Sequence, residues 1–227
     1  MRIALLDYHK NDKNVKESEK IQKRLITAGA DAVDIYRILQ NQLPKVEDYS
    51  KFVLSGSDTY NLLDRHDAKK SLNIVEKANS LGKKVLAFCG GFELLAVVGY
   101  GLKFEELGQG ECGFFERELT VEGEKDSLFR KIPKRYSVLE VHKRFIKGEN
   151  IGEILSTYKS GDSEIVDEIK FGENIYGMQG HPEDTFEEAQ EVIKKYGKNN
   201  GSIILGMTRS FLLNKNNLIF ENFINNL

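Results

Sequence analysis

The sequence predicts an α/β fold: a doubly wound, mostly parallel sheet with helices on both faces and a smaller region of antiparallel strands. Two observations lead to this prediction. In the first hundred residues, short apolar runs alternate with segments whose apolar residues recur at helical spacing, as in β-α-β units. Between residues 102 and 179, extended runs follow one another with glycine-containing turns between some of them, which is typical of antiparallel strands.

Four apolar runs in the amino-terminal part indicate buried strands, at residues 3–8, 32–36, 52–54 and 84–88. Helical patterns separate or follow them, at residues 15–28, 68–80 and 92–98. Gly29 and Gly82 end the first two helices, because glycine readily takes the left-handed conformation that closes a helix.

The central part contains shorter extended runs, at residues 119–121, 137–141, 154–157, 165–169 and 175–178. Thr185 and Glu188 have the spacing of a capping box, which predicts a helix that reaches about Tyr196. A terminal helix is expected at residues 218–224, while the segment 198–215 has no assigned role. Because no repeat or linker interrupts the pattern, residues 1–227 are predicted to form a single domain.

Composition limits the classes of partner. The formal net charge of −2 gives no overall attraction to nucleic acid or to acidic membranes. The first apolar run is too short for an export signal or a membrane span, and the chain has only two cysteines, Cys89 and Cys112. These features predict a cytoplasmic protein in a reducing compartment, with no nucleic acid and no membrane partner.

Residues 87–91, Ala-Phe-Cys-Gly-Gly, place Cys89 between a strand and a helix, with small residues around it. This is the arrangement of a nucleophile elbow, where a tight turn exposes the reacting side chain. A cysteine considered alone is more often a buried core residue, but the two following glycines and the strand-to-helix context favour a nucleophile. The free N–H groups of the following helix, Gly90 first, are candidates to hold an oxyanion.

His181-Pro182-Glu183 offers a base and an acid that orients it. Proline favours an extended conformation for the residue before it, so the side chains of His181 and Glu183 are expected on the same side of the chain. Glu183 would then orient the imidazole and stabilise its charged form. The alternative is a loop histidine followed by an acid near a helix start.

Residues 54–58, Leu-Ser-Gly-Ser-Asp, end a buried strand upstream of the elbow. Loops at the carboxyl ends of parallel strands meet at one crevice, so backbone N–H groups near Gly56 and Ser57 are candidates for a second oxyanion donor. An ordinary turn into a helix explains the segment equally well.

With these segments the chain resembles the class I, triad-type glutamine amidotransferases, which have a flavodoxin-like fold. The resemblance covers most of the length and is most specific in Gly-x-Gln-x-His-Pro-Glu, residues 177–183, together with Cys89. It implies attack of Cys89 on the side-chain amide of glutamine, departure of ammonia with a proton from His181, and hydrolysis of a γ-glutamyl thioester. The chain leaves no room for a synthetase domain, so a separate synthetase subunit is the implied acceptor of ammonia.

Two alternatives remain open. The elbow form Cys-x-Gly-Phe-Glu also resembles the γ-glutamyl hydrolases, which cut γ-glutamyl peptide bonds and need no partner. A regulatory or binding subunit without turnover is the third reading, and the intact triad argues against it.

Two further positions follow from the resemblance. Family members usually have glutamine four residues after the cysteine, where this chain has Glu93. A carboxylate accepts hydrogen bonds but does not donate them, so Glu93 would favour an ammonium or amide N–H of the substrate; a place on the pocket rim is the alternative. His142 lies where the family often has a histidine near the glutamine backbone, with an exposed strand histidine as the alternative.

No other motif predicts a cofactor or a metal. The sequence has no phosphate-binding glycine loop and no paired metal-ligand spacing. A basic cluster most simply forms a solvated face, or else docks an acidic substrate or a synthetase: Arg130, Lys131, Lys134, Arg135, Lys143, Arg144 and Lys147.

Overall fold

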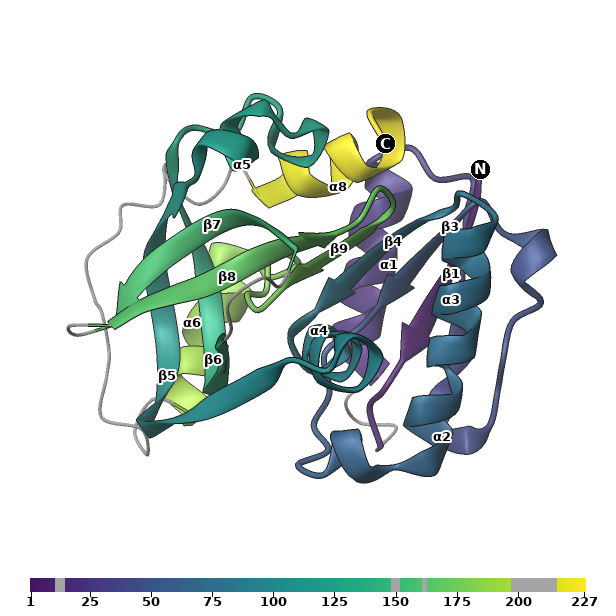
Figure 1. Cartoon of the computed structure of the whole chain (residues 1–227), viewed down its shortest axis with the longest axis horizontal. Coiled ribbons are helices and arrows are strands. Elements are labelled where there is room, and N and C mark those ends of the chain that lie inside the picture. The colour runs from purple at the N-terminus through teal and green to yellow at the C-terminus, as the bar shows by residue number, and fades with distance from the viewer. Residues whose placement is uncertain (11–14, 148–151, 161–162, 197–215) are drawn as a thin grey trace.

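The computed structural model describes residues 1–10, 15–147, 152–160, 163–196 and 216–227 (Figure 1). These residues form a nine-stranded sheet with the order β2-β1-β3-β4-β9-β8-β6-β5-β7. The strands are β1 (Arg2–Asp7), β2 (Ala32–Arg37), β3 (Lys51–Leu54), β4 (Lys84–Phe88), β5 (Lys103–Leu119), β6 (Arg135–Lys147), β7 (Glu153–Ser160), β8 (Ser163–Phe171) and β9 (Ile175–Met178). The helices are α1 (Val15–Thr27), α2 (His66–Lys70), α3 (Leu72–Ser80), α4 (Cys89–Glu93), α5 (Val121–Lys125), α6 (Phe186–Tyr196) and α8 (Asn216–Asn225).

One side of the sheet is parallel. Strand β1 pairs with β2 and β3, β3 pairs with β4, and β4 pairs with β9, all in parallel register. All four residues of β3 are buried, as expected for a strand covered on both faces. This side carries the carboxyl ends of β3 and β4, where the segments around Ser57 and Cys89 begin.

The other side is antiparallel and larger than the sequence analysis expected. Strand β5 has 17 residues and β6 has 13, and the two pair along most of their length across an irregularity between Glu106 and Glu111. The prediction of a mostly parallel sheet with a smaller antiparallel region was therefore wrong in its proportions, although the α/β class is confirmed. Apolar runs underestimate these strands because many of their residues are polar.

Strand β9 joins the two sides, since it pairs in parallel with β4 and antiparallel with β8. The sequence predicts residues 175–178 only as an antiparallel strand, so the parallel pairing with β4 corrects that prediction. The short run at residues 119–121 is the end of β5 followed by α5, and not a separate strand.

Helices cover both faces of the parallel strands. One core contains Leu6, Phe52 and Leu54 of the sheet with Val75 of α3, and a second contains Leu5, Val53 and Leu86 with residues of α1 and α8. Figure 1 shows α3 and α4 in front of these strands and α1 behind them. The alternation of side chains along each strand separates the two cores.

Two local predictions hold. The capping box of α6 forms, because the Thr185 N–H donates to Glu188 at 2.7 Å and the Glu188 N–H donates to the Thr185 hydroxyl at 3.1 Å. The helix predicted at residues 92–98 begins earlier, at Cys89, and continues as a π-helical segment, Leu94–Gly99.

The unassigned segment 198–215 lies outside the described residues. Within the described part of the chain, no helix is long and apolar enough to cross a membrane.

Candidate active site

Cys89 occupies a strained turn between β4 and α4. Its φ is +43°, in the left-handed region that residues other than glycine seldom adopt. Backbone strain of this kind persists only where the surrounding structure imposes it, and it is frequent at reacting groups. The predicted strand-to-helix turn at Cys89 is thus confirmed.

The two glycines after Cys89 allow the upstream loop to approach closely. A Cβ added at Gly90 would lie 2.8 Å from the Ser57 Cβ and 3.0 Å from the Ser57 nitrogen. A Cβ at Gly91 would lie 2.5 Å from the Ser55 carbonyl oxygen, which accepts the Gly91 N–H at 3.0 Å. The loops that follow β3 and β4 therefore pack against each other, and the two candidate oxyanion segments are brought together.

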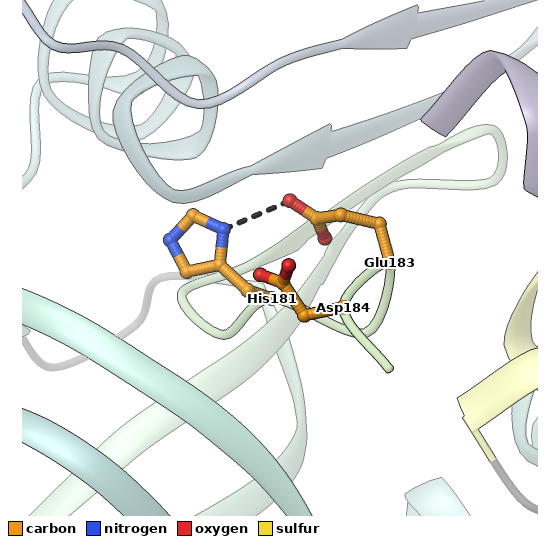
Figure 2. Close-up of side chains that lie close together, drawn as sticks. All are labelled: His181, Glu183 and Asp184. Carbon is orange, nitrogen blue, oxygen red and sulfur yellow. Dashed lines mark hydrogen bonds and ion pairs between the residues drawn. The ribbon is translucent and has the colours of Figure 1, made fainter. Parts of the chain in front are cut away.

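His181 and Glu183 form the predicted pair. The His181 Nδ1 lies 2.9 Å from the Glu183 Oε1, as the dashed line in Figure 2 marks. The backbone N–H of His181 donates to the Leu139 carbonyl at 2.9 Å, which fixes this segment against β6. Burial alone would lower the pKa of His181, but Glu183 and Cys89 outweigh it and hold the pKa well above its usual value.

Gly56 marks the point where these groups meet. A Cβ placed there would lie 3.3 Å from the His181 Cε1 and 3.6 Å from the Cys89 Cβ. The structure thus brings Cys89, His181 and Gly56 to one location from three different segments. A side chain larger than hydrogen at residue 56 would crowd the histidine.

Asp184 is an acidic neighbour that the sequence analysis did not single out. Its carboxylate lies beside the His181–Glu183 pair (Figure 2) and pairs with Lys20 at 2.5 Å. Burial, with a contribution from the Glu183 charge, raises the pKa of Asp184 to about 6, although Lys20 opposes the shift.

The ligand-type atoms of His181, Glu183 and Asp184 lie within 4.8 Å of one another, a group that could hold a metal ion. However, the His181 Nδ1 is hydrogen-bonded to Glu183, and Lys20 already supplies a positive charge to Asp184. These contacts already orient the imidazole and balance the charge of Asp184, which is the arrangement expected of an acid–base pair.

Glu93, the last residue of α4, lies close to Cys89. The Gln179 Nε2 donates to the Glu93 Oε1 at 3.3 Å and lies 3.8 Å from the Cys89 sulfur. Burial raises the pKa of Glu93, partly offset by Arg144 and His142. Gln179 was overlooked as a site residue, although an extended conformation predicted for this segment would place it, two residues before His181, on the same side of the chain.

Two cavities meet at Cys89. The smaller, about 280 Å³, includes Glu93, Arg144 and Tyr60 in its wall. The larger, about 640 Å³, includes His181, Glu183 and Lys20. Four residues line both: Ser57, Asp58, Cys89 and Val141. Cys89 is therefore reached from two sides, one next to Glu93 and one next to His181.

His142 is buried, so the alternative of an exposed strand histidine is wrong. Its Nδ1 donates to the Arg144 carbonyl at 2.6 Å, and its Nε2 lies 2.9 Å from Glu140 and 3.3 Å from Glu111. Glu111 lies on β5, and Glu140 and His142 lie on the neighbouring antiparallel strand β6. His142 contributes to the wall of the smaller cavity, but a hydrogen bond from it to a substrate would have to replace one of these contacts.

The basic cluster divides into two groups, apart from Lys147, whose side chain lies outside what the structure describes. Five of its members are exposed, as a solvated face requires: Arg130, Lys131, Lys134, Arg135 and Lys143. Arg144 differs, because its side chain is only 16% exposed and its guanidinium lies over the rings of Tyr60 and Phe104. For Arg144 the solvated-face interpretation is wrong.

Comparison with known proteins supports a family assignment. The family model for glutamine amidotransferase class-I matches residues 12–198. Gamma-glutamyl peptidase 5 of Arabidopsis thaliana is 25% identical over 71% of this chain and 66% of its own length, slightly under two thirds. A component of the glutamine-hydrolyzing GMP synthase of Methanococcus aeolicus is 26% identical over 71% of this chain and 82% of its own. A crystal structure of a glutamine amidotransferase from Thermotoga maritima superimposes with a TM-score of 0.70 at 17% identity, covering 99% of this chain and 98% of that one.

Proposed function

Because the chain belongs to the class I glutamine amidotransferase family, we propose that it hydrolyses the side-chain amide of glutamine through a γ-glutamyl thioester on Cys89. The observation that supports this most directly is the meeting of Cys89, His181 and Gly56 at the junction of two cavities. The products are glutamate and ammonia. We also infer that the chain acts as one domain, since the described strands belong to one sheet.

In the first half of the reaction, the Cys89 sulfur attacks the amide carbon. A positively charged imidazole next to the sulfur supports its thiolate form, and the raised pKa of His181 is consistent with that charge. The C–S bond forms, the negative charge on the amide oxygen is held by backbone N–H groups of Gly90 and Ser57, and Gly56 leaves space for the imidazole. The C–N bond then breaks as His181 gives its proton to the departing nitrogen.

In the second half, water enters where ammonia left. The now neutral His181 takes a proton from the water, whose oxygen attacks the thioester carbon. The C–S bond breaks, glutamate leaves, and the thiolate–imidazolium pair is restored. Glu183 keeps the same ring nitrogen of His181 occupied throughout, so the other nitrogen alone exchanges the proton.

Glu93 is proposed to bind the α-ammonium group of the substrate. It lines the smaller cavity, and Gln179 connects it to the sulfur by two contacts of 3.3 and 3.8 Å. A carboxylate in a partly buried site gains most from a cationic partner, because the partner offsets the unfavourable burial of its charge. Glutamine at this position, which the family usually has, would bind an ammonium less strongly.

The ammonia is proposed to pass to a separate synthetase subunit. This proposal is supported by the similarity to a protein named as one component of a GMP synthase. The match covers 82% of the length of that relative. A cytoplasmic location remains the expectation from composition.

A γ-glutamyl peptide hydrolase is the second candidate. A cavity of about 640 Å³ lies on the His181 side of Cys89, where the leaving amine departs, and ammonia alone needs far less space. Glu93 and the similarity to a protein named gamma-glutamyl peptidase 5 support the same reading. The third candidate, a binding subunit without turnover, is disfavoured by the assembled Cys89, His181 and Glu183.

The test is release of ammonia and glutamate from L-glutamine by the purified protein, beside Cys89→Ser as control. We expect activity that the control reduces by several orders of magnitude. A γ-glutamyl dipeptide in the same assay separates the first two candidates, since faster cleavage of the dipeptide than of glutamine would favour the hydrolase. Absence of turnover, together with absence of a Cys89 adduct after treatment with a glutamine-like electrophile, would support the non-catalytic binding role.

A further inference from the structure

Arg144 is held in a fixed orientation at the wall of the smaller cavity. Its guanidinium carbon lies 4.9 Å from the centre of the Tyr60 ring and 4.7 Å from that of Phe104. A planar guanidinium stacks well on aromatic faces, and two rings restrict it more than one does. The side chain is only 16% exposed, and Arg144 is one of the residues that line the smaller cavity.

The acidic neighbours of Arg144 stand too far away for hydrogen bonds. The nearest oxygen of Glu93 is 4.0 Å from its Nη1, and the nearest oxygen of Glu106 is 3.9 Å from its Nε. Hydrogen bonds between these atom types are about 2.7–3.2 Å long. With respect to the acids that the structure describes, the guanidinium therefore keeps donors for a further carboxylate, which it would bind through two parallel N–H contacts.

The smaller cavity thus carries opposite charges beside the nucleophile. Glu93 and Arg144 lie in its wall together with Cys89. A γ-glutamyl group has its ammonium and its carboxylate on one carbon, so a neighbouring anion and cation in the protein match the two charges. A volume of about 280 Å³ suits such a small ligand.

We propose that Arg144 binds the α-carboxylate of the γ-glutamyl group and, with Glu93, selects substrates whose α-ammonium and α-carboxylate are both free. This inference rests on the proposed function, because it names the part of the substrate that this site recognises. The rival explanation is that Arg144 only balances the charge of Glu93 in the folded protein.

The first experiment compares two substrates. L-Glutamine has the α-carboxylate, whereas 4-aminobutanamide is the same molecule without it. For Arg144→Met we expect kcat/KM on L-glutamine to fall about tenfold to a hundredfold, mainly through KM, as loss of a charge-assisted contact predicts. On 4-aminobutanamide the variant should stay within about threefold of wild type. Arg144→Lys keeps the positive charge but lacks the planar guanidinium that can make two parallel contacts. Its kcat/KM on L-glutamine should therefore lie between those of wild type and Arg144→Met.

The control for this experiment is Arg135→Met. Arg135 also lies on β6, but its side chain is 64% exposed and pairs with Glu118 on the surface. Its replacement should change the kinetics of neither substrate. Equal losses on both substrates in Arg144→Met would mean that the variant disturbs the site in general, and would overturn the assignment.

The second experiment needs no turnover. Binding of L-glutamate and of L-glutamine is measured by calorimetry in the Cys89→Ser background, with and without Arg144→Met. A rise in Kd of about tenfold or more for both ligands supports the assignment, even if the wild-type protein hydrolyses no glutamine and the proposed reaction is wrong. Equal affinities with and without Arg144→Met, or no binding in either protein, would overturn it while leaving the hydrolysis assay to judge the reaction separately.

Discussion

Replacing Gly90 by alanine tests whether the nucleophile turn and the loop after β3 act as one unit. The added Cβ would lie 2.8 Å from the Ser57 Cβ and 3.0 Å from the Ser57 nitrogen, whereas ordinary contacts are 3.4–4 Å. Both atoms belong to or adjoin the backbone, so no flexible side chain can rotate away. The Ser57 loop, or the turn at Cys89, must therefore move by a large fraction of an ångström.

The expected loss follows from that displacement. Removal of one oxyanion donor typically reduces kcat about 10²–10³-fold, and a misplacement of about 1 Å in an active site has an effect of about 10²-fold. We therefore expect Gly90→Ala to lower kcat on glutamine about a hundredfold, with KM nearly unchanged. Overpacking of this kind should also lower the free energy of unfolding by about 1–3 kcal/mol.

Steady-state kinetics and urea unfolding measure the two quantities on the same samples. Gly99→Ala is the matched control, because its Cβ would meet the nearest atoms, on Leu95 and Leu72, at 3.5 and 4.0 Å. That variant should keep full activity and stability. If Gly90→Ala retained wild-type kcat and stability, the Ser57 loop would have to be free to relax, and the proposed pair of oxyanion donors would be wrong.

Three further changes address the charges around the site. Glu183→Gln should lower the pKa of the His181 imidazole, because it removes the charge that raises this pKa most. An NMR titration of the imidazole that gives the wild-type pKa in this variant would contradict the prediction. The pKa of Asp184 is raised from 3.8 to about 6 in the fold, so the native state binds more protons in this range and stability falls as pH rises from about 4 to about 6. In urea unfolding, the free energy of unfolding of wild type should fall between pH 4 and pH 7 by up to about 3 kcal/mol more than that of Asp184→Asn. A difference between the two proteins that is the same at both pH values would refute the raised pKa of Asp184. Arg117→Leu should lower the free energy of unfolding by about 3–5 kcal/mol, since the fully buried guanidinium neutralises buried acids of β6 and β8; a loss below about 1 kcal/mol in urea unfolding would argue against that role.

The local parts of the site could be predicted from the sequence. The turn at Cys89 depends on a buried strand, small neighbours and a following helix, all of which lie within about ten residues. The contact between His181 and Glu183 depends on one proline and on the two-residue period of an extended chain. Such features need no knowledge of what packs against them.

The surroundings of the substrate could not be predicted in the same way. Arg144 and His142 are two residues apart on β6 and both help to line the smaller cavity, yet Arg144 lies over two aromatic rings whereas His142 is buried with two acids. Which atoms of a strand residue meet solvent depends on the neighbouring strands and on the loop that carries Tyr60. For Arg144 the sequence offered only its place in a basic cluster, most simply solvated or else docking an acidic substrate or a synthetase.

The sequence by itself determined the local geometry: a cysteine on a tight turn, a histidine next to a carboxylate, and an α/β frame that presents them. Only the tertiary structure decided the proportions of the sheet, the two cavities beside Cys89 and the placement of Glu93 opposite Arg144. The reason is physical. Backbone preferences act over a few residues, whereas burial and the pairing of distant charges arise when segments far apart in the chain pack together.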